Sequence, residues 1–207
     1  MELRDPTHLY EGEISPKAER IANAISVIGQ PIFIPIPVFA LICLVIGDAA
    51  EYAKILAISL LFVAVLPTVI TYYFSIKMGR KDGDIPDRTK RYIPMAIGIV
   101  SYAIGSAVLY LADAPRIVTV LMVCYAVVTA VMLIVTFYWK ISIHAVGVVG
   151  PTMALAYVYW PWGLLFGLLF IPIAWSRYVL KRHTPAQLLA GALVGIIVSG
   201  AIFWFAL

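Results

Sequence analysis

The sequence predicts an all-α protein, a polytopic membrane bundle of six or seven transmembrane helices. Of the 207 residues, 63% are hydrophobic and only 13% are charged. The apolar runs also reach the length of about 20 residues that a helix needs to cross about 30 Å of hydrocarbon. Runs of this length exceed what a core helix in a soluble domain needs, so we expect the chain to lie in a membrane.

Seven apolar segments are candidates for the membrane spans, each bounded by charges, prolines or a Trp-Pro-Trp triplet. They cover roughly residues 21–46, 53–78, 93–112, 116–138, 144–159, 163–180 and 187–206. Pro31, Pro35 and Pro37 should kink or break the first segment, because proline removes a helical hydrogen bond. The fifth segment is short, so six spans is the alternative to seven.

Residues 1–20 are expected to form a polar tail, and residues 21–207 a single membrane-embedded domain. Five carboxylates and no apolar core lie in the tail, which therefore reads as a solvated or interfacial segment and not as a cleavable signal peptide. Cys43 and Cys124 lie inside apolar runs and are expected to be small buried side chains. The four-residue spacing of Gly163 and Gly167, and of Gly191 and Gly195, suits close helix packing.

The cations are distributed unequally between the two faces that seven alternating spans would create. One face would carry Arg4, Lys17, Arg20, Lys77, Arg80, Lys81, Arg88, Lys90, Arg91, Lys140, Arg177, Lys181 and Arg182, and the other Lys54 and Arg116. The positive-inside bias predicts that the richer face is cytoplasmic, in an integral protein of the cell membrane. Lys90, Arg91 and Lys181 are expected to contact anionic lipid headgroups.

Two histidines stand at the start of predicted spans on this same face. Ser142 is a candidate N-cap for the helix that contains His144. Thr184 and Gln187 fit a capping box at a second helix that begins beside His183. Helix N-termini attract anions, and cations lie nearby in the sequence, so we expect a phosphate site at this membrane interface.

Three short motifs on this face carry the residues with chemistry. Lys81 and Arg88 are separated by six residues, Ser142 and His144 form a Ser-x-His pair, and Ser176-Arg177 is followed after five residues by His183 and then, four positions on, by Gln187. The order and spacing of these motifs resemble the type 2 phosphatidic acid phosphatase superfamily, whose motifs are K-x6-R-P, P-S-G-H and S-R-x5-H-x3-D. The resemblance covers roughly residues 81–195. Thr89 stands where the family has Pro, Ile143 where it has Gly, and Gln187 where it has Asp.

The resemblance implies a phosphatase that works through a phosphohistidine and requires no metal or other cofactor. His183 would be the nucleophile, and His144 would protonate the leaving alkoxide and then activate water. Gln187 would occupy the place of the Asp that orients the nucleophile. The residues implied to hold the phosphate oxygens are Lys81, Arg88, Ser142 and Arg177.

The expected partners are membrane lipids and a lipid phosphate substrate, such as phosphatidic acid, phosphatidylglycerophosphate or a polyprenyl phosphate or diphosphate; no nucleic acid is expected. The alternative is a catalytically degenerate relative that binds or transports a phosphorylated lipid, which Ile143 and Gln187 favour. Residues 82–88 also bear a faint likeness to the start of the CDP-alcohol phosphotransferase signature. That signature and an Asp-rich prenyltransferase both need further carboxylates, and residues 93–112 contain none.

Overall fold

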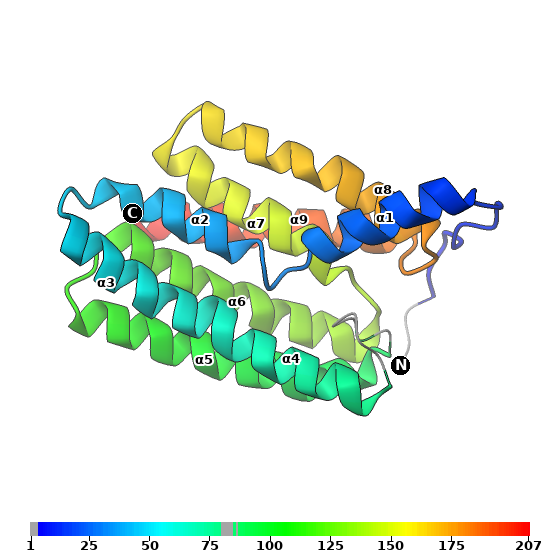
Figure 1. The fold of residues 1–207 in the computed structure, drawn as a ribbon, viewed down its shortest axis with the longest axis horizontal. Coiled ribbons are helices and arrows are strands. Elements are labelled where there is room, and N and C mark those ends of the chain that lie inside the picture. The colour runs from blue at the N-terminus through cyan, green and yellow to red at the C-terminus, as the bar shows by residue number, and fades with distance from the viewer. Residues whose placement is uncertain (1–3, 80–84, 86) are drawn as a thin grey trace.

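The computed structural model describes residues 4–79, 85 and 87–207, and these ranges contain helices and no strand. The elements are α1 (Pro16–Ile28), α2 (Pro35–Ile42), η1 (Cys43–Val45), α3 (Ala49–Leu60), η2 (Leu61–Val65), α4 (Leu66–Lys77), η3 (Thr89–Arg91), α5 (Tyr92–Leu111), α6 (Arg116–Tyr138), α7 (Ile143–Val158), η4 (Trp162–Leu169), α8 (Phe170–Val179) and α9 (Pro185–Ala206). Figure 1 shows them as one bundle of roughly aligned helices. The predicted all-α fold is confirmed.

Five helical segments in the described ranges are long and apolar enough to cross a membrane, as expected of an integral membrane protein. They are Ala49–Lys77, Thr89–Leu111, Arg116–Tyr138, Trp162–Val179 and Pro185–Ala206. Two further apolar helices, Pro35–Val45 and Ile143–Val158, are shorter. The structure therefore gives five candidate spans by length and composition, where the sequence predicts six or seven.

The first predicted span is broken, as its prolines predict. Ser15 caps α1 by accepting a hydrogen bond from the Ala18 N–H, and α1 ends at Ile28. The chain resumes a regular α-helix only at Pro35, which occupies the first turn of α2. Neither piece is long enough to cross about 30 Å of hydrocarbon at 1.5 Å per residue.

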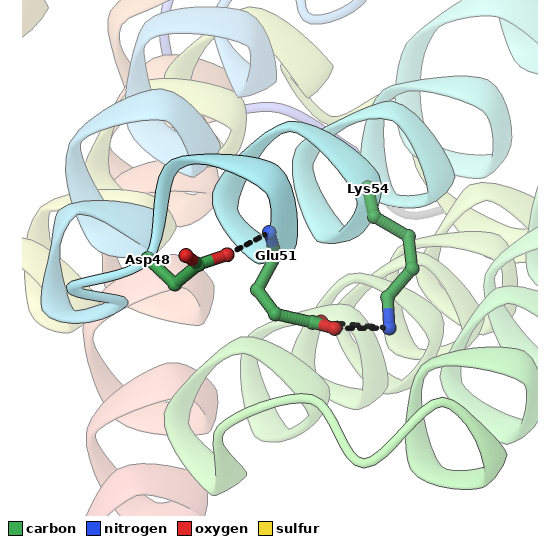
Figure 2. Close-up of polar contacts among 3 residues, drawn as sticks. All are labelled: Asp48, Glu51 and Lys54. Carbon is green, nitrogen blue, oxygen red and sulfur yellow. Dashed lines mark hydrogen bonds and ion pairs between the residues drawn. The ribbon is translucent and has the colours of Figure 1, made fainter.

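The second span begins with a well-defined cap at the end of the bundle remote from the histidines. The Asp48 carboxylate accepts a hydrogen bond from the Glu51 N–H at 2.8 Å, and Glu51 pairs with Lys54 at 2.7 Å (Figure 2). An acidic N-cap stabilises the helix because it satisfies a free N–H and complements the helix dipole. Lys54 is one of the two cations predicted for this face, and it is exposed and paired with a carboxylate.

A π-helical turn, η2, lies inside this span just before Pro67 in the first turn of α4. A proline cannot donate to the preceding turn, and a π turn is one way in which a helix absorbs that loss. The Ser101 hydroxyl of α5 donates to the Phe62 carbonyl at 2.7 Å. The interrupted hydrogen-bond ladder is thus supported by a side chain of the neighbouring helix.

Helices α7 and α9 pack closely at small residues. A Cβ on Gly191 would lie 2.6 Å from the Ser142 carbonyl oxygen, and one on Gly195 would lie 3.0 Å from the backbone nitrogen of Gly150. The predicted role of Gly191 and Gly195 in close packing is confirmed. Gly163 is as restricted, since its Cβ would overlap the Leu155 carbonyl of α7.

The connections that carry the two histidines lie at one end of the bundle, which we call the histidine end. There α6 passes into α7 and α8 into α9, close to the C-terminal end of α4 and the N-terminal end of α5 (Figure 1). The connections α2–α3 and α5–α6 lie at the opposite end. The N-terminal tail lies at the histidine end and the C-terminus at the opposite end.

Candidate functional site

His144 is positioned by the N-terminus of α7. The Ser142 side chain caps this helix by accepting from the Ala145 N–H at 3.4 Å, as the sequence predicts. His144 is the second residue of the helix and is only 7% exposed. His144 therefore belongs to the first turn of α7, whose N–H groups lack intrahelical partners.

His183 is positioned by the tight turn that joins α8 to α9. Lys181 adopts a left-handed conformation with φ of 57°, and the Arg177 carbonyl accepts from the N–H groups of both Arg182 and His183. Thr184 then caps α9, whose capping box with Gln187 is confirmed. His183 is 1% exposed.

A backbone hydrogen bond joins the two histidine-bearing helix starts. The Ser142 N–H donates to the Gln187 carbonyl at 3.2 Å. This bond, together with the glycine contacts described above, holds the N-terminus of α7 against the first turns of α9. His144 and His183 consequently belong to one packed unit.

The Gln187 side chain selects one form of neutral His183. Gln187 Oε1 lies 3.0 Å from His183 Nδ1 and also accepts from the Thr184 N–H at 3.4 Å. An amide oxygen only accepts hydrogen bonds, so this network assigns the proton to Nδ1. Nε2 then carries the lone pair, which can attack an electrophile or accept a proton.

Buried cations surround His183. Arg177 is 2% exposed and donates to the Ser26 hydroxyl at 2.8 Å, and Arg91 is 5% exposed. Burial lowers the pKa of His183 well below its usual range, and the positive charges of Arg177 and Arg91 lower it further, with smaller effects of Lys140 and His144. Without a bound anion the imidazole is therefore neutral at physiological pH.

One cavity receives both histidines. Its volume is about 170 Å³, and its polar lining includes His144, His183 and Arg91. Away from these residues it is lined mainly by apolar side chains of α4, α5, α6 and α7. It extends from Arg91, just before α5, to Tyr102, eleven positions further on in α5, which corresponds to about 16 Å of helix.

The predicted phosphate-binding cations have different positions in the structure. Arg177 is near His183, as described, whereas the Arg88 guanidinium donates to the Thr136 and Phe137 carbonyls at 3.1 and 2.8 Å, at the C-terminal end of α6. Arg88 thus helps to cap α6. None of the predicted phosphate ligands Arg88, Arg177 and Ser142 is part of the described cavity lining. Lys81 lies outside the described residues.

Arg91 is the site residue that sequence reasoning missed, since it was expected to contact lipid headgroups. Its Nε donates to the Ile85 carbonyl at 2.5 Å, and it lines the cavity with the histidines. Helical periodicity could have identified it, because Arg91, Met95, Gly98 and Tyr102 recur at helical spacing and all line the cavity.

The second missed residue is Asp5 of the polar tail. Its Oδ2 accepts from the Thr184 hydroxyl at 2.6 Å, across 179 positions in the sequence. No local pattern signals such a long-range contact. Only the excess of carboxylates in the tail, which shares a face with the basic loops, was a general indication of it.

Within the described ranges, no group of three His, Cys, Asp or Glu side chains could hold a metal ion. Comparisons with protein-family models, with curated proteins and with solved structures each found no match. The case for a function therefore rests on the site itself.

Proposed function

We propose that the protein is a membrane phosphatase that hydrolyses a lipid phosphate monoester or a polyprenyl phosphate or diphosphate through a phosphohistidine. The observation that carries the proposal is the shared cavity: His144, His183 and Arg91 border a space that continues between the helices as an apolar channel. A phosphate at the polar part and a hydrocarbon chain in the apolar part together match an amphiphilic phosphate ester.

In the proposed first step, His183 Nε2 attacks phosphorus and the P–O bond to the leaving group breaks. His144 donates a proton to the departing oxygen, so a monoester releases the lipid alcohol and a diphosphate releases the lipid monophosphate. Water then attacks the phosphohistidine while His144 takes one of its protons. The P–N bond breaks, which releases inorganic phosphate and restores neutral His183.

The charges around His183 support these roles. The low pKa of His183 keeps the nucleophile unprotonated before substrate binds. Arg91, which lines the cavity, supplies a guanidinium for the nonbridging oxygens, and guanidinium groups suit the geometry of phosphate. Arg177 lies outside the cavity lining and adds its positive charge close to His183. The N-terminus of α7, where the helix dipole favours negative charge, adds to the stabilisation as that charge develops.

The decisive measurement is release of inorganic phosphate from phosphatidic acid by the purified protein in detergent with a chelator present. His183→Ala should lower turnover at least about 1,000-fold, as loss of a nucleophile does. His8→Ala, which changes an exposed histidine of the tail, is the matched control and should leave turnover unchanged. Phosphate release that survives in His183→Ala would contradict the mechanism.

A second candidate function is binding or transport of a phosphorylated lipid without hydrolysis. The neutral amide of Gln187 favours this second function, since the phosphatase superfamily that the motifs resemble has a carboxylate at this position. Saturable binding of phosphatidic acid by a wild-type protein that releases no phosphate from any lipid phosphate tested would support this candidate over the enzyme.

We further propose that the histidine end faces the cytoplasm, in the cell membrane. Thirteen Lys and Arg residues lie on this predicted face against two on the other, and such a bias favours retention inside. Cys43 and Cys124 are buried, so single exposed cysteines can be probed with an impermeant reagent. In intact cells Asp113→Cys should be labelled and Lys181→Cys protected; the reverse pattern would reverse the orientation.

A further inference from the structure

The cavity that contains the two histidines continues deep into the bundle along two antiparallel helices. Along the chain into α5 its lining runs from Arg91 to Tyr102, as described above. On α6, which runs in the opposite direction (Figure 1), the lining extends from Met132, toward the histidine end, to Leu121, again eleven positions. Both helices therefore give the cavity a depth of about 16 Å at 1.5 Å per residue.

The deep end of the cavity is closed by three aromatic side chains, Phe39, Tyr102 and Tyr125, which we call the aromatic floor. The ring centroid of Tyr125 lies 5.8 Å from that of Tyr102 and 5.9 Å from that of Phe39. The two tyrosines line the cavity, whereas Phe39 is fully buried and does not. Leu109 and Val118, one or two turns further from the histidines, are also fully buried, and the described lining stops before them. The cavity therefore ends inside the bundle.

The size of the cavity suits one hydrocarbon chain. Its volume is about 170 Å³, and an engineered apolar cavity of about 150 Å³ in another protein binds one benzene molecule. A single slender chain fits such a space, and the two parallel chains of a diacyl lipid do not. Carbon–carbon bonds of about 1.5 Å advance an extended chain by about 1.3 Å each, so a depth of about 16 Å holds a phosphate and a chain of about ten carbons.

We propose that the cavity selects lipid phosphates by their hydrocarbon: it takes one alkyl or prenyl chain of about ten carbons, whose end meets Tyr102 and Tyr125. This inference rests on the proposed phosphatase function and adds a substrate class to it. A longer chain cannot pass the aromatic floor without displacing packed side chains. A shorter chain leaves part of the lining without contacts. Both therefore bind less well than a chain that reaches the floor.

The first test is a competition among substrates. The full-length protein in detergent receives straight-chain alkyl phosphates of about 8 to about 18 carbons, a range that brackets the length estimated from bond geometry. All are present at the same mole fraction in the micelles, and the ratios of the released alcohols give relative kcat/KM. Chains of about ten carbons should exceed chains of about 16 at least about tenfold, because overfilling a packed site is costly. A flat profile, or one that rises steadily with length, would overturn the inference; if turnover still depended on His183, the proposed function would stand.

Filling the cavity from α5 should shorten the preferred chain. Gly98 lines the cavity one turn before Tyr102, and a Cβ there would lie no closer than 3.7 Å to the Tyr102 ring, an ordinary contact. Gly98→Leu therefore adds bulk to the cavity without forcing backbone apart. The optimum should move to chains shorter by about four carbons, the length of one helical turn. Ala103→Leu, at an exposed position of the same helix, should keep the wild-type optimum. An optimum that is the same in Gly98→Leu and Ala103→Leu would overturn the inference.

Removing part of the aromatic floor should have the opposite effect. Tyr125→Ala deepens the cavity, so the optimum should move toward longer chains. Val123→Ala, at a side chain of α6 that is 38% exposed, is the control and should leave the optimum in place. A shift of Tyr125→Ala toward shorter chains would contradict the proposed floor. If Tyr125→Ala does not fold, Gly98→Leu still decides the inference.

A measurement that needs no turnover separates this inference from the proposed function. Alkyl phosphonates of the same chain lengths have a P–C bond in place of the ester P–O bond, and a ligand that binds the folded state raises the Tm. The rise in Tm of the wild-type protein should be largest at about ten carbons, and the maximum should move to shorter chains in Gly98→Leu. If the wild type hydrolyses no lipid phosphate, the proposed function fails, yet this profile still tests the cavity. Equal rises in Tm at all lengths would overturn the inference.

Discussion

Replacing Gly191 by alanine tests the packing that holds the two histidines together. The new Cβ would lie 2.6 Å from the Ser142 carbonyl oxygen and 3.0 Å from the Ala145 Cβ, whereas ordinary contact begins at 3.4 Å. The closest contact is thus about 0.8 Å too short, and its partner is backbone, which cannot rotate away. Helices α7 and α9 must move apart at the position where Ser142 and Gln187 are hydrogen-bonded.

Gly200→Ala in the same helix is the matched control. Its Cβ would meet only the terminal methyl of Met153, at 3.4 Å, and a methionine side chain can adjust. Both substitutions gain about 1 kcal/mol of helix propensity, so this term cancels when the two variants are compared. The difference that remains is the cost of overpacking, about 1–3 kcal/mol.

Thermal unfolding of both variants in the same detergent measures this difference. Gly191→Ala should have a Tm lower than that of Gly200→Ala by about 2–12 °C, the range that 1–3 kcal/mol gives for a chain of this size. A Tm equal to or higher than that of Gly200→Ala would refute the argument that α7 and α9 are in contact at this glycine.

Two further predictions concern charge at the site. Arg91→Gln should lower kcat/KM about 10- to 100-fold, because a charged hydrogen bond to phosphate contributes about 1.5–3 kcal/mol. Lys90→Gln changes an exposed neighbour and should leave kcat/KM nearly unchanged. Equal losses in the two variants would show that Arg91 does not belong to the site. The second prediction is that the folded state loses stability as the pH falls below about 6.5, the ordinary pKa of His. The reason is that the pKa of His183 is lowered in the folded state, so the unfolded chain binds the proton more readily. Chemical unfolding from pH 8 to pH 5 should show a smaller loss in His183→Gln than in the wild type, and identical pH profiles would contradict the prediction.

Local chemistry in the sequence predicted the local structure of the site. Ser142 is an N-cap, Thr184 and Gln187 form a capping box, and the prolines after Gly29 end the first helix. Each of these features depends on residues within four positions of one another. Such patterns can be read from the chain because the groups that satisfy the backbone are close in sequence.

Contacts between distant segments could not be predicted in the same way. Arg88 and Arg91 stand three positions apart in one basic loop, yet Arg88 bonds to carbonyls of α6 and Arg91 enters the cavity. The two side chains have different contacts because of the turn of η3, and the preferences of neighbouring residues do not determine that turn. The docking of Asp5 on Thr184 likewise depends on where the bundle brings the tail, and the composition of the tail indicates only that it is polar.

The length of α7 has a consequence for the membrane around the site. Its 16 residues span about 24 Å, which is about 6 Å less than a typical hydrocarbon core. If the C-terminal end of α7 lies at one surface of the bilayer, its N-terminus lies below the headgroups of the opposite surface. The bilayer must then become thinner around the N-terminus or admit water there. A substrate headgroup would then have to sink below its neighbours to be cleaved, so that the thickness of the surrounding lipid, and not only its chemistry, would govern turnover.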